Sequence, residues 1–142
     1  MTEYVVLGAR ITTGLMAGLY FAFAVAVMPA IHGLGDAAFV DTMKRINVSI
    51  VNLAFLVVFF LAPLLTVAAA AMVRSPVMYA AFALGVMTLA ITVALNIPLN
   101  NALAAGGSRA NFEYSWVLFN GLRTLTGIAS YVTLLLSRSP IH

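Results

Sequence analysis

Residues 50–72 read IVNLAFLVVFFLAPLLTVAAAAM, a stretch without a charged side chain. A helix needs about 20 mainly apolar residues to cross a bilayer, and this stretch is long enough. Similar stretches lie at residues 5–29, 76–96 and 111–137. The chain of 142 residues is 63% hydrophobic and 8% charged, whereas soluble proteins carry about 25% charged residues. We therefore expect an all-α integral membrane protein, with residues 1–142 forming a single transmembrane domain.

The predicted fold is a four-helix bundle with an amphipathic extension before the second transmembrane helix. In residues 37–49 apolar side chains recur at helical spacing between charged ones, so a helix over 37–72 should begin at the membrane interface. The first helix should end at Pro29, and the third should break or kink at Pro98, because proline lacks a backbone donor and collides with the carbonyl four residues before it. Ser75 is expected to cap the third helix.

Composition excludes several classes of site. The chain has no cysteine, so thiolate metal sites, iron–sulfur clusters and disulfides are ruled out. Its seven basic and four acidic residues form no basic patch, so we expect no nucleic-acid partner. The seven methionines are scattered along the chain and indicate packing rather than a copper site. No metal is expected.

The location follows from the same segments. We expect a multi-pass membrane protein whose first helix is retained, because the N-terminus lacks the pattern of a signal peptide. Four spans would place both termini on one side. Arg74 and Arg138 would lie on that side, and Lys44, Arg45 and Arg109 on the other, so these basic residues do not decide the orientation. Arg10, on the side of the termini, favours cytoplasmic termini.

An arginine inside the last apolar segment needs an explanation. Trp116, Asn120 and Arg123 stand at i, i+4 and i+7, which is one face of a helix, and Gly127 and Tyr131 continue the stripe. A guanidinium at the centre of a membrane helix costs about 2.5 to 3.5 kcal/mol. We therefore expect this face to look into the protein, toward a partner.

Chain order brings further polar residues to this face. In an antiparallel bundle, His32 at the end of the first helix, Asn47 near the second, and Asn96 and Asn100 at the end of the third would lie at the same membrane face as Trp116. This one-sided polarity predicts a pocket open at one face and disfavours a transport path through the membrane. A structural alternative remains, in which Arg123 caps carbonyls freed by Pro98 and the asparagines bridge helices.

Four motifs follow one another along the chain: Gly14-x-x-x-Gly18 with Phe21-x-Phe23 and Pro29; Phe39-x-x-x-Met43-x-x-Ile46-Asn47; Asn96-x-Pro98-Leu99-Asn100; and Trp116-x-x-x-Asn120-x-x-Arg123. In this order they resemble the anthrone oxygenase-like family of small membrane proteins. The resemblance implies a four-helix membrane fold. For the characterised members it also implies oxidation of an anthrone, an activated aromatic ketone, to a quinone by molecular oxygen without a recognised cofactor.

For an oxidoreductase of this kind the residues suggest a mechanism. A base would remove the acidic benzylic proton, hydrogen-bond donors would hold the enolate oxygen, and an aromatic side chain would stack on the flat ring. The expected catalytic residues are His32, Arg123, Asn100 and Asn120, and the expected substrate-binding residues are Asn47, Asn96 and Trp116.

A second hypothesis is a non-catalytic accessory subunit that binds a lipid or a quinone. The Gly14/Gly18 face would let another helix approach closely, either in a homo-oligomer or in a larger assembly. Under both hypotheses the expected partners are membrane lipids and a small aromatic or lipid-like ligand.

Overall fold

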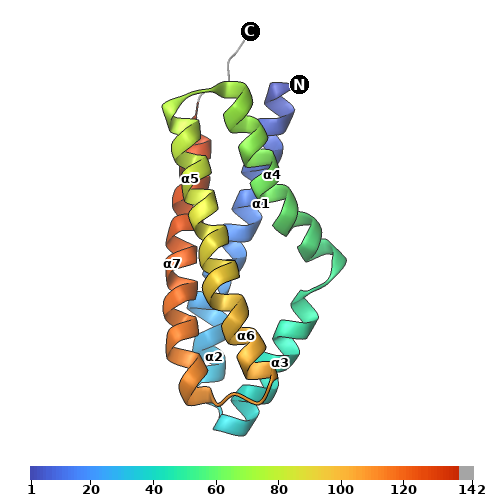
Figure 1. Ribbon diagram of the computed structural model, residues 1–142, viewed down its shortest axis with the longest axis vertical. Helices are drawn as coiled ribbons and strands as arrows, with labels where there is room; N and C mark the ends of the chain where they lie inside the picture. The colour runs from blue at the N-terminus through green and yellow to red at the C-terminus, as the bar shows by residue number, and fades with distance from the viewer. Residues whose placement is uncertain (138–142) are drawn as a thin grey trace.

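The computed structural model describes residues 1–137, and Arg138, used in the orientation prediction, lies outside them. The described residues are helical apart from short connections (Figure 1). The elements are α1 (Thr2–Ala22), the π-helical turn η1 (Phe23–Val27), α2 (Met28–His32), α3 (Asp36–Ile50), α4 (Leu53–Val73), α5 (Pro76–Ile91), the π-helical turn η2 (Thr92–Asn96), α6 (Ile97–Ala104) and α7 (Arg109–Leu136). Since α1, η1 and α2 are continuous, and α5, η2 and α6 likewise, the described part of the chain has five helices and not the four predicted.

The first helix continues past Pro29, so that prediction is wrong, and the third continues past Pro98, so the break predicted as one of two outcomes there is also wrong. The residue before each proline donates its backbone N–H to a carbonyl five residues back, Met28 to Phe23 and Ile97 to Thr92. Such a π-helical turn is wider than an α-helical one. It accommodates the proline ring that follows, which would collide with the carbonyl of residue i−4 in a regular α-helix. The two helices therefore continue to His32 and Ala104.

The single helix predicted over residues 37–72 is also wrong, because the chain breaks at Val51 and Asn52. Asn52 has an extended backbone, and its Oδ1 accepts a hydrogen bond from the N–H of Phe55 at 3.1 Å. This is an N-cap, which satisfies one of the free donors at the start of α4. The α3–α4 junction, Val51–Asn52, projects sideways at the right of Figure 1.

Within residues 1–137, three helices are long and apolar enough to cross a membrane: Thr2–His32, Leu53–Val73 and Pro76–Ala104. Their outward faces expose large apolar side chains, including Leu15, Leu64 and Val86. These features fit a membrane protein. The fourth predicted span, α7, is not among the three, because polar side chains along its buried face lower its mean hydropathy.

Helix α7 packs against α1 and α5, and α1 packs against α4 (Figure 1). Gly14 belongs to this packing, since a Cβ there would lie 2.9 Å from a ring carbon of Tyr131. Gly18 has open space around it. Gly14 therefore packs within the chain, whereas Gly18 does not. An oligomer contact at the Gly14/Gly18 face stays a prediction. Ser75 caps α5 as expected, accepting from the N–H of Met78.

Candidate functional site

The predicted polar face of α7 is buried. Trp116, Asn120 and Arg123 are 2%, 1% and 8% exposed, and Gly127 is buried behind them. Arg123 lies 14 residues after Arg109, where α7 begins, which is about 21 Å along the helix axis. The arginine is therefore deep in the molecule and surrounded by the neighbouring helices.

Few groups hold the guanidinium of Arg123. Its Nε donates to Asn120 Oδ1 at 3.0 Å, and among the described residues it makes no other hydrogen bond and no ion pair. Its central carbon lies 4.5 Å from the ring centroid of Tyr20 and 5.2 Å from that of Trp116. These are cation–π contacts, which stabilise a desolvated cation without neutralising it. Arg123 does not cap carbonyls near Pro98, so that part of the structural alternative is not observed. The other part is observed, because Asn96 Nδ2 donates to the Trp116 carbonyl at 3.4 Å and Asn120 Nδ2 donates to the Tyr20 carbonyl at 3.2 Å, and both bonds bridge two helices.

Arg123 lines a cavity of about 310 Å³. Its walls come from all five helices and are mainly aromatic and aliphatic, as in many small-molecule sites. Its polar lining side chains are Tyr20, Asn47, Thr92, Asn100, Trp116 and Arg123. None of the lining residues, all of which are described, is a carboxylate or a histidine. The arrangement suits a flat apolar molecule with an oxygen atom directed at the guanidinium.

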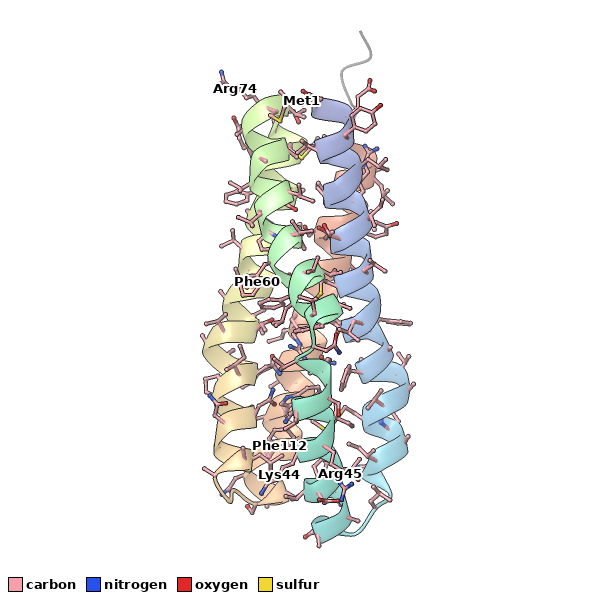
Figure 2. All side chains as sticks on the ribbon, turned by 90° about the vertical axis from the view of Figure 1, so that its right-hand side faces the viewer. Met1, Lys44, Arg45, Phe60, Arg74 and Phe112 are labelled. Atoms are coloured by element: carbon pink, nitrogen blue, oxygen red, sulfur yellow. The ribbon has the colours of Figure 1, made fainter. Side chains whose placement is uncertain are left out.

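The cavity extends to the α3–α4 junction. Val51 at the junction and Phe60 on α4 line it and are 59% and 58% exposed. Figure 2 shows Phe60 close to the junction, far from both Arg74 and Arg45 at the two ends of the molecule. The opening therefore lies on the apolar side surface. The sequence had predicted a pocket open at one polar membrane face instead.

The asparagines have different positions. Asn47 and Asn100 line the cavity, and Asn100 Oδ1 accepts from Trp116 Nε1 at 2.8 Å. Asn120 lies behind Arg123 and donates to the Tyr20 carbonyl at 3.2 Å. Asn96 does not line the cavity and is only 1% exposed. Its Oδ1 has no hydrogen-bond partner among the described residues. Four of the predicted residues thus meet at the cavity, and two support them from behind.

His32 is not brought to the cavity. Its side chain is 74% exposed, and its Nδ1 lies 2.7 Å from Glu113 Oε1. Glu113 precedes Arg123 by ten residues on α7, about 15 Å along the axis. Arg109 also bonds Glu113, at 2.6 Å, and this guanidinium lowers the pKa of the carboxyl. His32 therefore belongs to an ionic cluster of His32, Asp36, Arg109 and Glu113 at the end of the molecule.

Several cavity residues were not predicted. Tyr20 on the first helix, Phe59 on α4, and Thr92 line the cavity but belonged to none of the sequence motifs. Phe23 also lines it and stood in the first motif, but no site role was predicted for it. The two prolines gave a usable signal, because each is preceded by a π-helical turn, and Phe23 and Thr92 begin those turns. Such turns are frequent at functional sites.

A family model described as anthrone oxygenase matches residues 36–133. The match covers more than two thirds of the chain, from the start of α3 to near the end of α7. The chain belongs to the anthrone oxygenase family. The resemblance found in the sequence motifs is thereby confirmed. Within the matched region lie Asn47, Asn100, Trp116 and Arg123, the four predicted residues that line the cavity of this family member. No curated protein and no solved structure matches the chain.

Proposed function

We propose that the protein is a membrane-embedded oxygenase that oxidises an anthrone-like or other activated aromatic substrate bound in the 310 Å³ cavity. Family membership supports an oxygenase-like role. The apolar lining, to which Trp116 contributes its indole, supports a flat aromatic substrate. All five helices contribute to the cavity, so their assembly is what forms the proposed site.

The observation that carries the proposal is Arg123, whose charge is buried without a carboxylate partner in the described chain. A buried ion without a counter-ion has a desolvation penalty of several kcal/mol. A substrate that becomes anionic would supply the missing charge at the guanidinium nitrogens. Because this attraction is stronger for the enolate than for the neutral ketone, Arg123 would favour ionisation of the substrate.

The reaction balances with oxygen as the only co-reactant. The benzylic CH₂ loses a proton, and the resulting carbanion adds oxygen, forming a C–O bond while reducing the oxygen to a peroxide. Protonation of the peroxide and loss of water then break the O–O bond and the remaining C–H bond, which leaves a carbonyl. In sum, one CH₂ and one O₂ give one C=O and one H₂O. Since the cavity lining offers neither carboxylate nor histidine, the proposal assigns proton acceptance to water and leaves His32 out of the chemistry.

The substrate would reach the cavity from the bilayer. The cavity-lining side chains of Val51 and Phe60 are exposed on the apolar side surface, where a lipid-soluble molecule is concentrated. In this proposal α7 also crosses the membrane, because it packs along α1 and α5, both parts of spanning segments. The termini would then share one side, which the sequence predicts to be cytoplasmic.

The test is aerobic turnover of a simple anthrone by the purified protein, followed as oxygen uptake and quinone absorbance. Arg123→Met should abolish most of the activity, and His32→Ala should retain it. Equal quinone formation by the wild type, Arg123→Met and a protein-free control would refute the proposed reaction.

A second candidate function is an accessory subunit that binds a quinone or lipid without turnover. The lack of a side-chain base among the cavity-lining residues favours this alternative. It predicts that an amphiphile co-purifies with the wild type and is lost in Arg123→Met. It also predicts that oxygen uptake with an anthrone stays at the background rate.

A further inference from the structure

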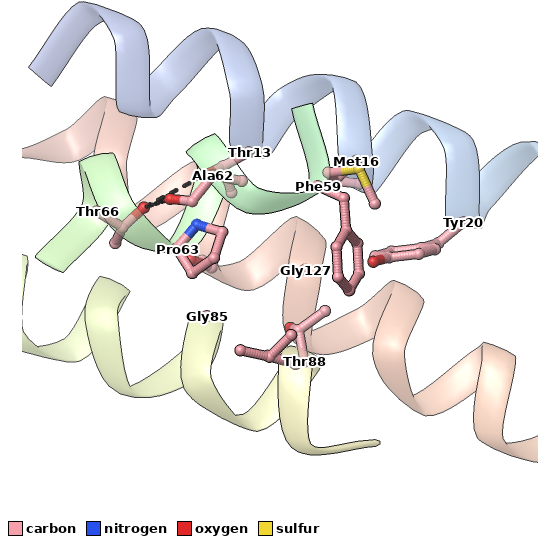
Figure 3. A pocket seen from close by; sticks show the side chains of 13 residues that line it. Thr13, Met16, Tyr20, Phe59, Ala62, Pro63, Thr66, Gly85, Thr88 and Gly127 are labelled. Atoms are coloured by element: carbon pink, nitrogen blue, oxygen red, sulfur yellow. Dashed lines mark hydrogen bonds between the residues drawn. The ribbon is translucent and has the colours of Figure 1, made fainter. Parts of the chain in front are cut away.

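A second, smaller cavity lies beside the proposed substrate site. It measures about 50 Å³ and is lined by residues of α1, α4, α5 and α7 (Figure 3). Tyr20 and Phe59 line both cavities, so their rings form the wall between them. Figure 3 shows these two rings next to each other, with the Tyr20 hydroxyl directed at Phe59. The small cavity therefore continues the large one on the side away from the α3–α4 junction.

Of the five hydroxyl-bearing side chains that line this cavity, those of Thr13, Thr66, Thr88 and Ser130 have hydrogen-bond partners. Thr66, Thr88 and Ser130 donate to backbone carbonyls at 2.7, 2.9 and 2.8 Å. Thr13 lies 3.4 Å from the Thr66 hydroxyl. A buried water typically makes about three hydrogen bonds, and here three of the hydroxyls, which already donate to carbonyls, could offer it only an acceptor oxygen. The remaining walls are aliphatic and aromatic, so the space favours an apolar occupant over water.

We propose that this cavity holds molecular oxygen and delivers it past Tyr20 and Phe59 to the substrate beside Arg123. The identity of the gas rests on the proposed oxygenase function. The volume of about 50 Å³ fits a diatomic molecule but excludes an aromatic substrate. Oxygen held there would approach the bound aromatic ring from inside the bundle, while the substrate enters from the α3–α4 junction.

Two glycines allow the cavity to be filled without a clash. A Cβ on Gly127 would lie 3.6 to 3.8 Å from atoms of Tyr20, Thr88 and Ala17, and a Cβ on Gly85 would lie 3.5 Å from Ser130 Oγ. These are ordinary contact distances, and the two glycines and their four neighbours all line the cavity. The filled variant is Gly85→Ala/Gly127→Ala.

A matched control carries the same two changes elsewhere. Gly18 and Gly121 are also helical, and a Cβ on either meets no atom within 4 Å. Gly18→Ala/Gly121→Ala therefore adds two methyl groups and the same gain in helix propensity without altering the cavity. Thermal unfolding of both variants checks that each one folds.

The experiment measures xenon binding and oxygen dependence in the wild type, the filled variant and the control. Xenon is an apolar probe that enters dry protein cavities. We expect xenon to bind the wild type and the control equally. It should bind the filled variant about tenfold more weakly, because one excess methylene in an apolar pocket weakens binding by at least about that factor. The KM for oxygen should rise in the filled variant alone, with the KM for anthrone unchanged.

Absence of xenon from the wild-type cavity, or an equal KM for oxygen in all three proteins, would overturn the oxygen site while leaving the oxygenase proposal intact. Conversely, a wild type that consumes no oxygen with an anthrone would refute the proposed reaction. The xenon comparison would then still decide whether the cavity takes an apolar gas.

Discussion

Replacing Arg123 with methionine separates a functional role of the charge from a structural one. Methionine keeps a long flexible side chain and removes the guanidinium. The change loses cation–π contacts with Tyr20 and Trp116, about 1 kcal/mol each. It also leaves Asn120 Oδ1 without its donor, which costs about 1 to 3 kcal/mol. Against these losses, it removes a buried charge without a counter-ion, whose desolvation penalty is several kcal/mol.

These contributions nearly cancel, so Arg123→Met should unfold within a few degrees of the wild type. The activity should fall much further. Removal of one preorganised donor from a developing oxyanion reduces kcat by about 100- to 1,000-fold. The assays are thermal unfolding in detergent and oxygen uptake with an anthrone. Arg123→Lys is the matched control, because it keeps the charge but loses the planar donor fork, and should retain part of the activity.

Either of two results would refute this reasoning. Full turnover by Arg123→Met would show that the guanidinium does not stabilise the reacting oxygen. A large fall in melting temperature, beyond the balance above, would show that Arg123 serves mainly to hold α7 against α1.

Three further predictions concern the surroundings of the site. His32→Ala should leave turnover unchanged and lower stability by at most about 1 kcal/mol, because the His32 side chain that contacts Glu113 is largely exposed. A variant that keeps its stability but loses turnover would instead show that His32 acts as a catalytic base. Asn52→Ala should lower stability by about 1 kcal/mol in thermal unfolding, because it removes the cap of α4, and an unchanged melting temperature would contradict that role. Arg109 lowers the pKa of Glu113, so the carboxylate contributes stability above pH 4.5, its ordinary pKa, that is lost as pH falls through the lower folded-state pKa. Glu113→Gln should flatten this acid-side loss of melting temperature, and an unaltered pH profile would contradict it.

The helical class was predictable because uninterrupted apolar stretches have few alternatives in a bilayer. The buried face of α7 was predictable too, since Trp116, Asn120 and Arg123 follow helical spacing and their polarity fits only an inward direction. The helix ends were less predictable. Proline rules assume i→i−4 hydrogen bonds, and the π-helical turns before Pro29 and Pro98 replace those bonds.

Position along the bundle axis was the main gap in predicting the site. Chain order correctly indicated that His32 lies at the same end of the bundle as the start of α7. It did not show that Glu113 and Arg109 would bind His32 there, about 15 Å along α7 from Arg123. Asn52 posed a similar difficulty, because an asparagine within an apolar run gives no sign of whether its side chain faces a neighbour or caps a new helix.

The central claim is that Arg123 binds the oxygen of a flat aromatic ligand in the 310 Å³ cavity. The most direct measurement is an experimental structure of the purified protein with a hydroxyanthraquinone, an anionic aromatic that is already oxidised. The account predicts the ring system between Trp116 and the α3–α4 junction, with one oxygen about 2.7 to 3.1 Å from the guanidinium nitrogens. A ligand bound outside this cavity, or bound with its oxygen atoms directed away from Arg123, would contradict it.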